Sequence, residues 1–172
     1  MSPARPQARI PVGVVVERRK ATSPWLDTVW RIVAVLGGLP DAAPWTMLDA
    51  AEDAATFYVG AAEIALYRTD TDHYRSNLAS AVPSVWVGLR PTGVEPPYNL
   101  FAVTADPDEG ESFTQAGADL VEAVPMPEAL RRIVEAFITE HHVEQPVYRR
   151  KRDRPGPEAV ARRGPTRKDR CA

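Results

Sequence analysis

Apolar residues recur at every second position in two stretches near the start of the chain, 10–16 and 30–36. A period of two, filled largely with β-branched residues, is typical of strands that bury one face. The two runs predict strands over 10–18 and 28–36. Shorter runs of the same kind predict further strands over 45–48, 56–59, 63–68, 84–90, 98–103 and 120–124.

Turn residues separate these predicted strands at short intervals. The segments Gly37–Pro40 and Pro91–Gly93 and the single Gly60 are the clearest breaks, because glycine and proline adopt the backbone angles that turns require. Short strands joined by short turns favour antiparallel neighbours. We therefore expect an α+β fold in which an antiparallel β meander is curled into a barrel or half-barrel, with Trp30 and Trp86 buried in its core.

A period near 3.6 is clearest over residues 127–142. Apolar side chains recur there three and four residues apart, Pro127 suits the first helical position, and Glu128 suits the first turn. We predict one long C-terminal amphipathic helix that packs across the sheet. A weaker helix is expected to start near Asp70 and run to about Ala79.

Charge divides the chain into two parts. From Gln145 to Ala172 there are ten Lys or Arg and three acids, a net charge of +7, whereas residues 1–144 hold eleven basic and twenty acidic residues, a net charge of −9. The basic segment is also rich in proline and poor in large apolar residues, so it cannot offset its ordering entropy by burial. We expect a flexible N-terminus over 1–9, a single α+β domain over 10–144, and a mostly disordered basic tail over 145–172.

The cysteine count and hydropathy bear on where the protein resides. Cys171 is the single cysteine, so no internal disulfide forms. The apolar run that begins at Val12 is broken by Glu17, well short of the roughly 20 residues that a spanning helix needs. We therefore expect a cytoplasmic protein with no membrane segment.

A polar insert, ERRKATSPWLDT, separates the first two predicted strands. Ser23 and Pro24 favour a turn, so the insert is interpreted as an extended hairpin tip. Two interpretations of its exposed residues remain. In the first, Arg18, Arg19, Lys20 and Trp25 form a contact surface for a partner. In the second, Trp25 folds back over one end of the barrel, as lone aromatic residues in loops commonly do.

Three clusters of polar residues were considered as chemical sites. Thr69–His73 contains two carboxylates and an imidazole but is also what a capped helix start looks like. Asp106–Glu111 lacks the residue order of a calcium loop and is interpreted as a capped turn. His141 and His142 are adjacent and would point about 100° apart on a helix, which disfavours a shared ion. We assign no catalytic residue, no metal ligand and no cofactor.

Several longer strings carry a family resemblance. They cover roughly residues 10–155 and read IPVGVVVERR from Ile10, SPWLDTVWR from Ser23, YRSNLAS from Tyr74, PSVWVGLRP from Pro83, PY from Pro97, VTADP from Val103, VPMPEAL from Val124, EHHVEQP from Glu140, and KRDR from Lys151. In these strings the chain resembles an uncharacterised proteobacterial domain family of unknown function. Genes of that family tend to lie near those of molybdenum-dependent formate dehydrogenase, so the resemblance implies an accessory role.

These observations favour a non-enzymatic adaptor that binds a protein partner, in particular a formate dehydrogenase subunit or maturation factor. Contact residues are expected in the insert and at the start of the tail, at Arg149, Arg150, Lys151 and Arg152. A second hypothesis is a nucleic-acid-associated regulator, since arginine binds phosphate as well as carboxylate. A third is an enzyme in which Asp70, Asp72 and His73 converge with other groups in a cleft.

Overall fold

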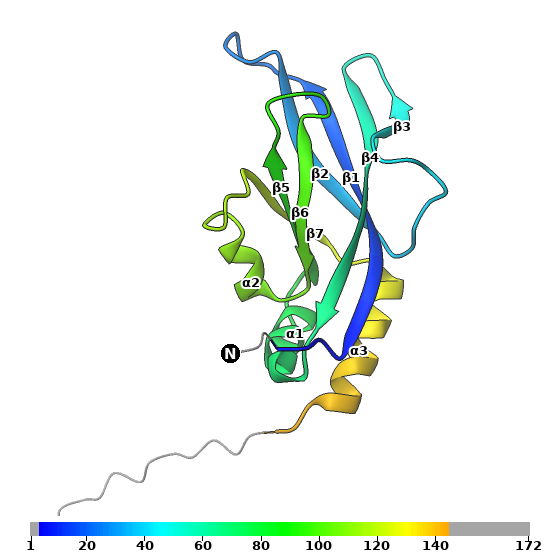
Figure 1. Ribbon diagram of the computed structural model, residues 1–172, viewed down its shortest axis with the longest axis vertical. Helices are drawn as coiled ribbons and strands as arrows, with labels where there is room; N and C mark the ends of the chain where they lie inside the picture. The colour runs from blue at the N-terminus through cyan, green and yellow to red at the C-terminus, as the bar shows by residue number, and fades with distance from the viewer. Residues whose placement is uncertain (1–3, 145–172) are drawn as a thin grey trace, which may run out of the picture. The chain divides into compact units, whose positions relative to one another are not determined.

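A computed structural model describes residues 4–144, and the expected basic tail over 145–172 lies outside them. The described part holds two antiparallel sheets and a few helices (Figure 1). The strands are β1 Ala8–Lys20, β2 Thr28–Leu36, β3 Thr46–Ala50, β4 Ala54–Leu66, β5 Ser84–Pro91, β6 Tyr98–Thr104 and β7 Leu120–Pro125. The helices are α1 Thr71–Leu78, preceded by a 3-10 turn over Arg68–Asp70, α2 Pro107–Ser112 and α3 Glu128–His141.

The larger sheet has the order β2-β1-β4-β3 and the smaller one the order β6-β5-β7. Every ladder in both sheets is antiparallel. Strands β1 and β4 are the longest, with 13 residues each, and pair along almost their full length. The N-terminal strand is therefore central to its sheet, which a simple meander does not allow.

The expected barrel or half-barrel is wrong, because neither sheet closes. β2 lies beside β7 and β4 lies beside β6, yet no ladder joins the two sheets. Between β2 and β7 the backbone N–H of Ile32 donates instead to the carboxylate of Glu122, and Arg31 lies 3.5 Å from the same carboxylate. Side chains thus replace the backbone hydrogen bonds that a closed barrel needs.

The expectation of one long C-terminal helix is also corrected. α3 spans 14 residues, about four turns, and all the helices are short. The helix follows Pro127 and ends before His142, whose backbone is extended. The predicted apolar spacing does place Leu130, Val134 and Phe137 in the core.

One continuous strand, β4, replaces the two strands expected over 56–59 and 63–68. At Gly60 the backbone φ angle is +146°, a value that residues with a side chain rarely adopt. The register with β1 shifts at the same place, between Val14 and Val15. A bulge of this kind bends a strand without ending it, so the glycine marks a bend and not a turn.

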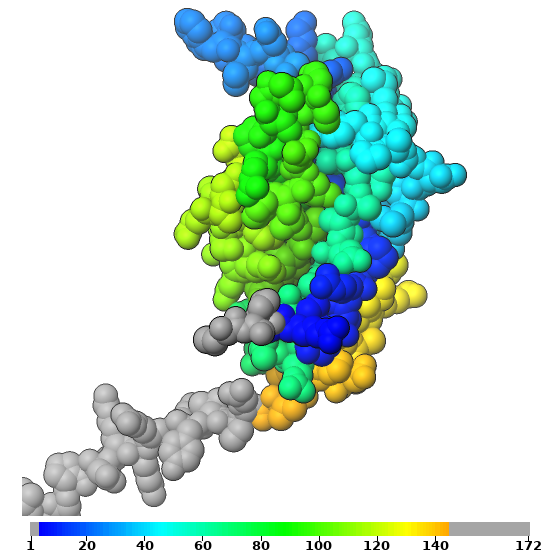
Figure 2. All heavy atoms as spheres, in the orientation of Figure 1, coloured from blue at the N-terminus to red at the C-terminus, as the bar shows by residue number. Residues whose placement is uncertain are grey.

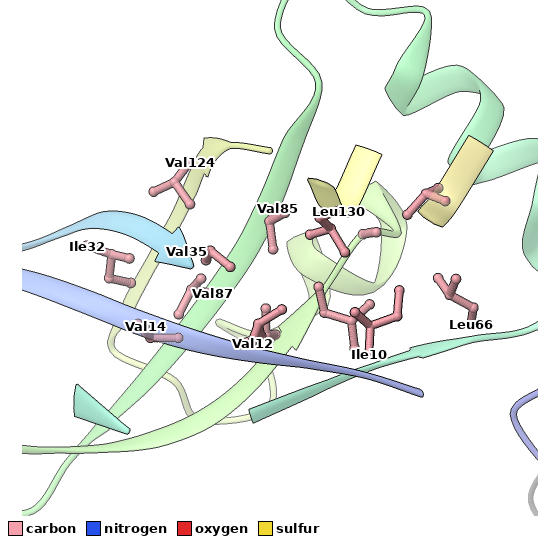
Figure 3. Packing of buried hydrophobic residues seen from close by; sticks show 14 of the residues in the cluster. Ile10, Val12, Val14, Ile32, Val35, Leu66, Val85, Val87, Val124 and Leu130 are labelled. Carbon is pink, nitrogen blue, oxygen red and sulfur yellow. The ribbon is translucent and has the colours of Figure 1, made fainter. Parts of the chain in front are cut away.

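The core lies between the two sheets and α3. Figure 3 shows valines of β1 and β5 facing one another, with Leu130 of α3 alongside. Val12, Val14, Val85, Val87 and Leu130 are fully buried. Trp30 and Trp86, in contrast, are only partly buried, so the expectation that both are buried in the core is wrong. Trp30 packs against the core cluster, and Trp86 lies next to Gly110 of α2.

None of the helices within residues 4–144 has the length and apolar character required to cross a membrane.

Candidate functional site

Three loops gather at one end of the domain, and we call this surface the open end. They are the β1–β2 hairpin tip over 21–27, the β3–β4 turn over 51–53 and the β5–β6 loop over 92–97 (Figure 2, blue, cyan and green). Exposed apolar side chains are concentrated on these loops and the strand ends beside them: Trp25, Leu26, Val29, Met47, Leu48 and Val94. Clusters of this kind mark interaction sites more often than single exposed residues do.

Trp25 projects into solvent at the hairpin tip. Its side chain is 90 % exposed, and its backbone N–H is held by the hydroxyl of Ser23 at 3.3 Å. It therefore does not fold back over the core, so the second interpretation of the insert is wrong. A large apolar ring left in water contributes nothing to folding.

An aromatic cluster lies behind the loops, on the inner face of the larger sheet. Trp30 packs edge-on against Trp45 and Tyr98, with ring centroids 5.8 Å and 6.1 Å away, and Phe57 lies 5.8 Å from it. All four rings are partly buried. Tyr98, the first residue of β6, reaches the cluster from the smaller sheet, and all four rings keep part of their surface open to solvent.

Arg18 is the basic residue that the fold brings to this cluster. Its guanidinium lies 5.8 Å from the centroid of Trp30 and 5.3 Å from that of Phe57, within the range of a cation–π contact. Arg19 instead pairs with Glu17 at 3.1 Å, on the opposite face of β1. The consecutive basic residues Arg18 and Arg19 therefore lie on opposite faces of β1.

Two adjoining hollows are formed by these rings and the β5–β6 loop. One has a volume of about 530 Å³ and is lined by Arg18, Pro44, Trp45, Phe57 and Pro96. The other has a volume of about 480 Å³ and is lined by Pro91, Val94 and Tyr98. Trp30, Glu95 and Pro97 line both hollows. A third hollow of about 300 Å³, between the two hairpins, includes Lys20.

The structure places those of the predicted contact residues that it describes on different surfaces. Arg18, Lys20 and Trp25 lie at the open end, Arg19 faces away, and Arg149, Arg150, Lys151 and Arg152 lie outside the described residues. The aromatic cluster itself was not anticipated. Its only sequence signal is the presence of large aromatic residues at strand ends that the pattern places on the core face.

A second site consists of polar side chains from the segments Thr69–His73 and Asp106–Glu111, which were considered separately from sequence alone. His73 of α1 lies with Nδ1 2.9 Å from Asp106 Oδ2 and with Nε2 3.6 Å from Asp108 Oδ2. Asp106 also caps α2, because its other oxygen accepts the backbone N–H of Asp108 at 2.9 Å. The segment interpreted as a capped turn is instead the start of the short helix α2. Its capping carboxylate is also hydrogen-bonded to the histidine of α1.

These three side chains are the group of potential metal ligands that residues 4–144 bring together. The two carboxylates lie on opposite ring nitrogens of His73, and one ion can take only one of those nitrogens. One ligand atom of each side chain lies within 4.8 Å of the others, but the two carboxylates approach different ring nitrogens, as expected when both nitrogens carry protons. The arrangement fits an imidazolium held between two carboxylates better than it fits a metal.

The hydrogen bond that the His73 ring donates to Asp106 is the main cause of a raised pKa of His73, and the charges of Asp106, Asp108 and Asp70 act in the same direction. Burial of the ring acts against them. A histidine with a raised pKa stabilises the fold fully below its unfolded pKa of about 6.5, and the stabilisation is lost as pH rises through the raised value.

We therefore expect the melting temperature of His73→Gln to fall below that of the wild type in mildly acid buffer, with the difference closing at alkaline pH. Melting curves across that range measure it. Asp106→Asn keeps the helix cap but removes the charge, and it should reduce the same pH-dependent difference. An equal difference between wild type and His73→Gln at every pH would contradict the assignment.

The remaining candidates point in different directions. Asp72 faces His142, whose Nδ1 lies 3.7 Å from it, while His142 Nε2 contacts Arg75 at 2.6 Å. His141 packs on the ring of Phe137 with centroids 4.4 Å apart. The two adjacent histidines thus have separate surroundings, and Asp72 faces His142 whereas His73 faces Asp106 and Asp108.

Comparison with known proteins gives one match. The family model described as a protein of unknown function, DUF3305, matches residues 11–152. No curated protein sequence and no solved structure matches the chain.

Proposed function

The chain belongs to the DUF3305 family, and from this premise we propose that it is a non-enzymatic adaptor that binds a partner polypeptide at the open end. The observation that carries the proposal is the concentration of exposed apolar side chains there, with Trp25 90 % exposed at its tip. Interface centres are enriched in Trp, Tyr and Arg. The open end offers these residue types on one surface.

The resemblance suggests the partner. Because genes of the family tend to lie near those of formate dehydrogenase, the proposed partner is a subunit of that molybdenum enzyme or one of its maturation factors, in the cytoplasm. The chemistry would then belong to the partner. The polar groups of the described residues support this, because His73, Asp106 and Asp108 are engaged with one another and with a helix end.

Affinity purification of the full chain from nuclease-treated cytoplasmic extract tests the proposal. We expect formate dehydrogenase subunits or maturation factors to be recovered. A chain truncated after Pro146 should recover them as well if the open end is the binding surface. Loss of recovery on truncation, together with nucleic acid that appears when nuclease is omitted, would favour the tail and the nucleic-acid hypothesis.

Trp25→Ala is expected to weaken partner binding at least about tenfold, as truncation of an interface tryptophan does, and to leave the melting temperature nearly unchanged. Titration of the recovered partner against both chains measures the affinity. Leu39→Ala is the matched control, because Leu39 is also exposed but follows β2 at the other end of that strand. Equal affinity of the partner for Trp25→Ala and for wild type would show that the partner does not bind at the hairpin tip.

A further inference from the structure

The two adjoining hollows of the open end restrict what kind of polypeptide fits them. They are walled mainly by aromatic rings and prolines, with Arg18 in the wall of the larger hollow, and Trp30 lines both. A binding site with this composition offers flat apolar surfaces and few polar groups.

The indole N–H groups add hydrogen-bond donors to these walls. Neither Trp30 nor Trp45 has its indole N–H bonded to another group among residues 4–144, and no buried side-chain polar atom there lacks a partner. Both indoles are therefore accessible to solvent. A segment that docks on the rings must offer acceptors to them, since a tryptophan N–H that loses water without gaining a partner costs free energy.

Glu95 supplies the one acid that lines both hollows. No ion pair joins it to any residue in the described part of the chain, since the salt bridges found there involve other acids. Its neighbours Pro96 and Pro97 place it at the rim of the aromatic surface. An incoming cation would find an unpaired carboxylate at this point.

From these three features we propose that the paired hollows bind a proline-rich segment in the polyproline II conformation, with a basic residue placed on Glu95. Such a segment has no internal hydrogen bonds and leaves its carbonyl groups free to accept from indoles. Its proline rings pack on aromatic side chains, and it loses little entropy because it is already extended. This inference rests on the proposed function and names the chemistry of the partner segment.

Peptides of defined composition test the inference on the full chain. The probes are eight prolines followed by arginine, eight prolines alone, and a glycine-serine peptide of equal length followed by arginine. Nitrogen–proton NMR follows the four indole N–H signals, with Trp25→Ala, Trp45→Phe and Trp86→Phe used to assign three of them and, by difference, that of Trp30. We expect both proline peptides to shift the signals of Trp30 and Trp45 and to leave that of Trp25 in place.

Glu95→Gln is the decisive variant, because it removes the charge and keeps the shape. It should weaken the arginine-containing proline peptide about twofold to fivefold, the range for an exposed ion pair, and leave the affinity for eight prolines unchanged. Glu52→Gln, in the separate hollow between the hairpins, is the matched control and should change neither affinity.

Two results would overturn the inference. One is an absence of indole shifts with either proline peptide at millimolar concentration. The other is an equal response to the glycine-serine peptide, which would show a charge contact with no preference for proline. Neither result touches the proposed function if Trp25→Ala still impairs partner recovery, so the two proposals fail separately.

Discussion

Replacing Asn77 by alanine is expected to lower the free energy of unfolding by about 3 kcal/mol or more, because each buried polar group left without a partner costs about 1–3 kcal/mol. Asn77 is 3 % exposed. Its amide donates to the carbonyls of Ser84 at 2.8 Å and Ala105 at 2.9 Å, and its oxygen accepts the N–H of Ser84 at 2.9 Å. One side chain thus holds α1 against the start of β5 and the end of β6.

Denaturant titration of Asn77→Ala measures the loss. Asn99→Ala provides the comparison, because Asn99 is exposed on β6 and surface substitutions of this kind change stability by about 0.5 kcal/mol or less. If the two variants were equally stable, water would have to replace the lost side chain at the α1–β5 junction without cost.

Leu130→Ala is expected to cost about 2–5 kcal/mol, the range for truncating a fully buried leucine. Leu130 has no exposed surface and contributes to the core cluster together with Val134 and Phe137 of the same helix. The substitution leaves a cavity between α3 and the sheets. It tests directly whether the helix is an integral part of the core.

Thermal and denaturant unfolding of Leu130→Ala should be compared with Ile133→Ala. Ile133 lies one turn further along α3 but is 44 % exposed, so its truncation removes less buried surface. A smaller loss for Leu130 than for Ile133 would mean that the helix buries the opposite face.

The alternation of apolar residues was sufficient to locate most of the strands. β2 has the predicted bounds, and α3 begins within one residue of its prediction, because a helix stripe and a strand face are both local patterns. Gly60 misled the prediction of β4, since a glycine that permits a bulge has the same local signature as one that permits a turn. Local pattern also does not distinguish strand order, so the expected barrel was wrong.

The polar contacts could not have been found from spacing. His73 and Asp106 are 33 residues apart in sequence. The first belongs to a segment with the pattern of a helix start, and the second to one interpreted as a capped turn. Their contact depends on how α1 and α2 pack against the smaller sheet. The aromatic cluster was missed for a similar reason, because it brings together Trp30 of β2, Phe57 of β4 and Tyr98 of β6, which are far apart in sequence.

The carboxylate of Glu122 that accepts the N–H of Ile32 has a mechanical consequence. No backbone ladder connects the larger and smaller sheets, so contacts made by side chains, such as this one, hold them together. Small sliding of packed units is a common low-cost motion in proteins. A slide along this join would carry the β5–β6 loop relative to Trp45 and Phe57, and it would adjust the width of the aromatic hollows without breaking a single strand pairing.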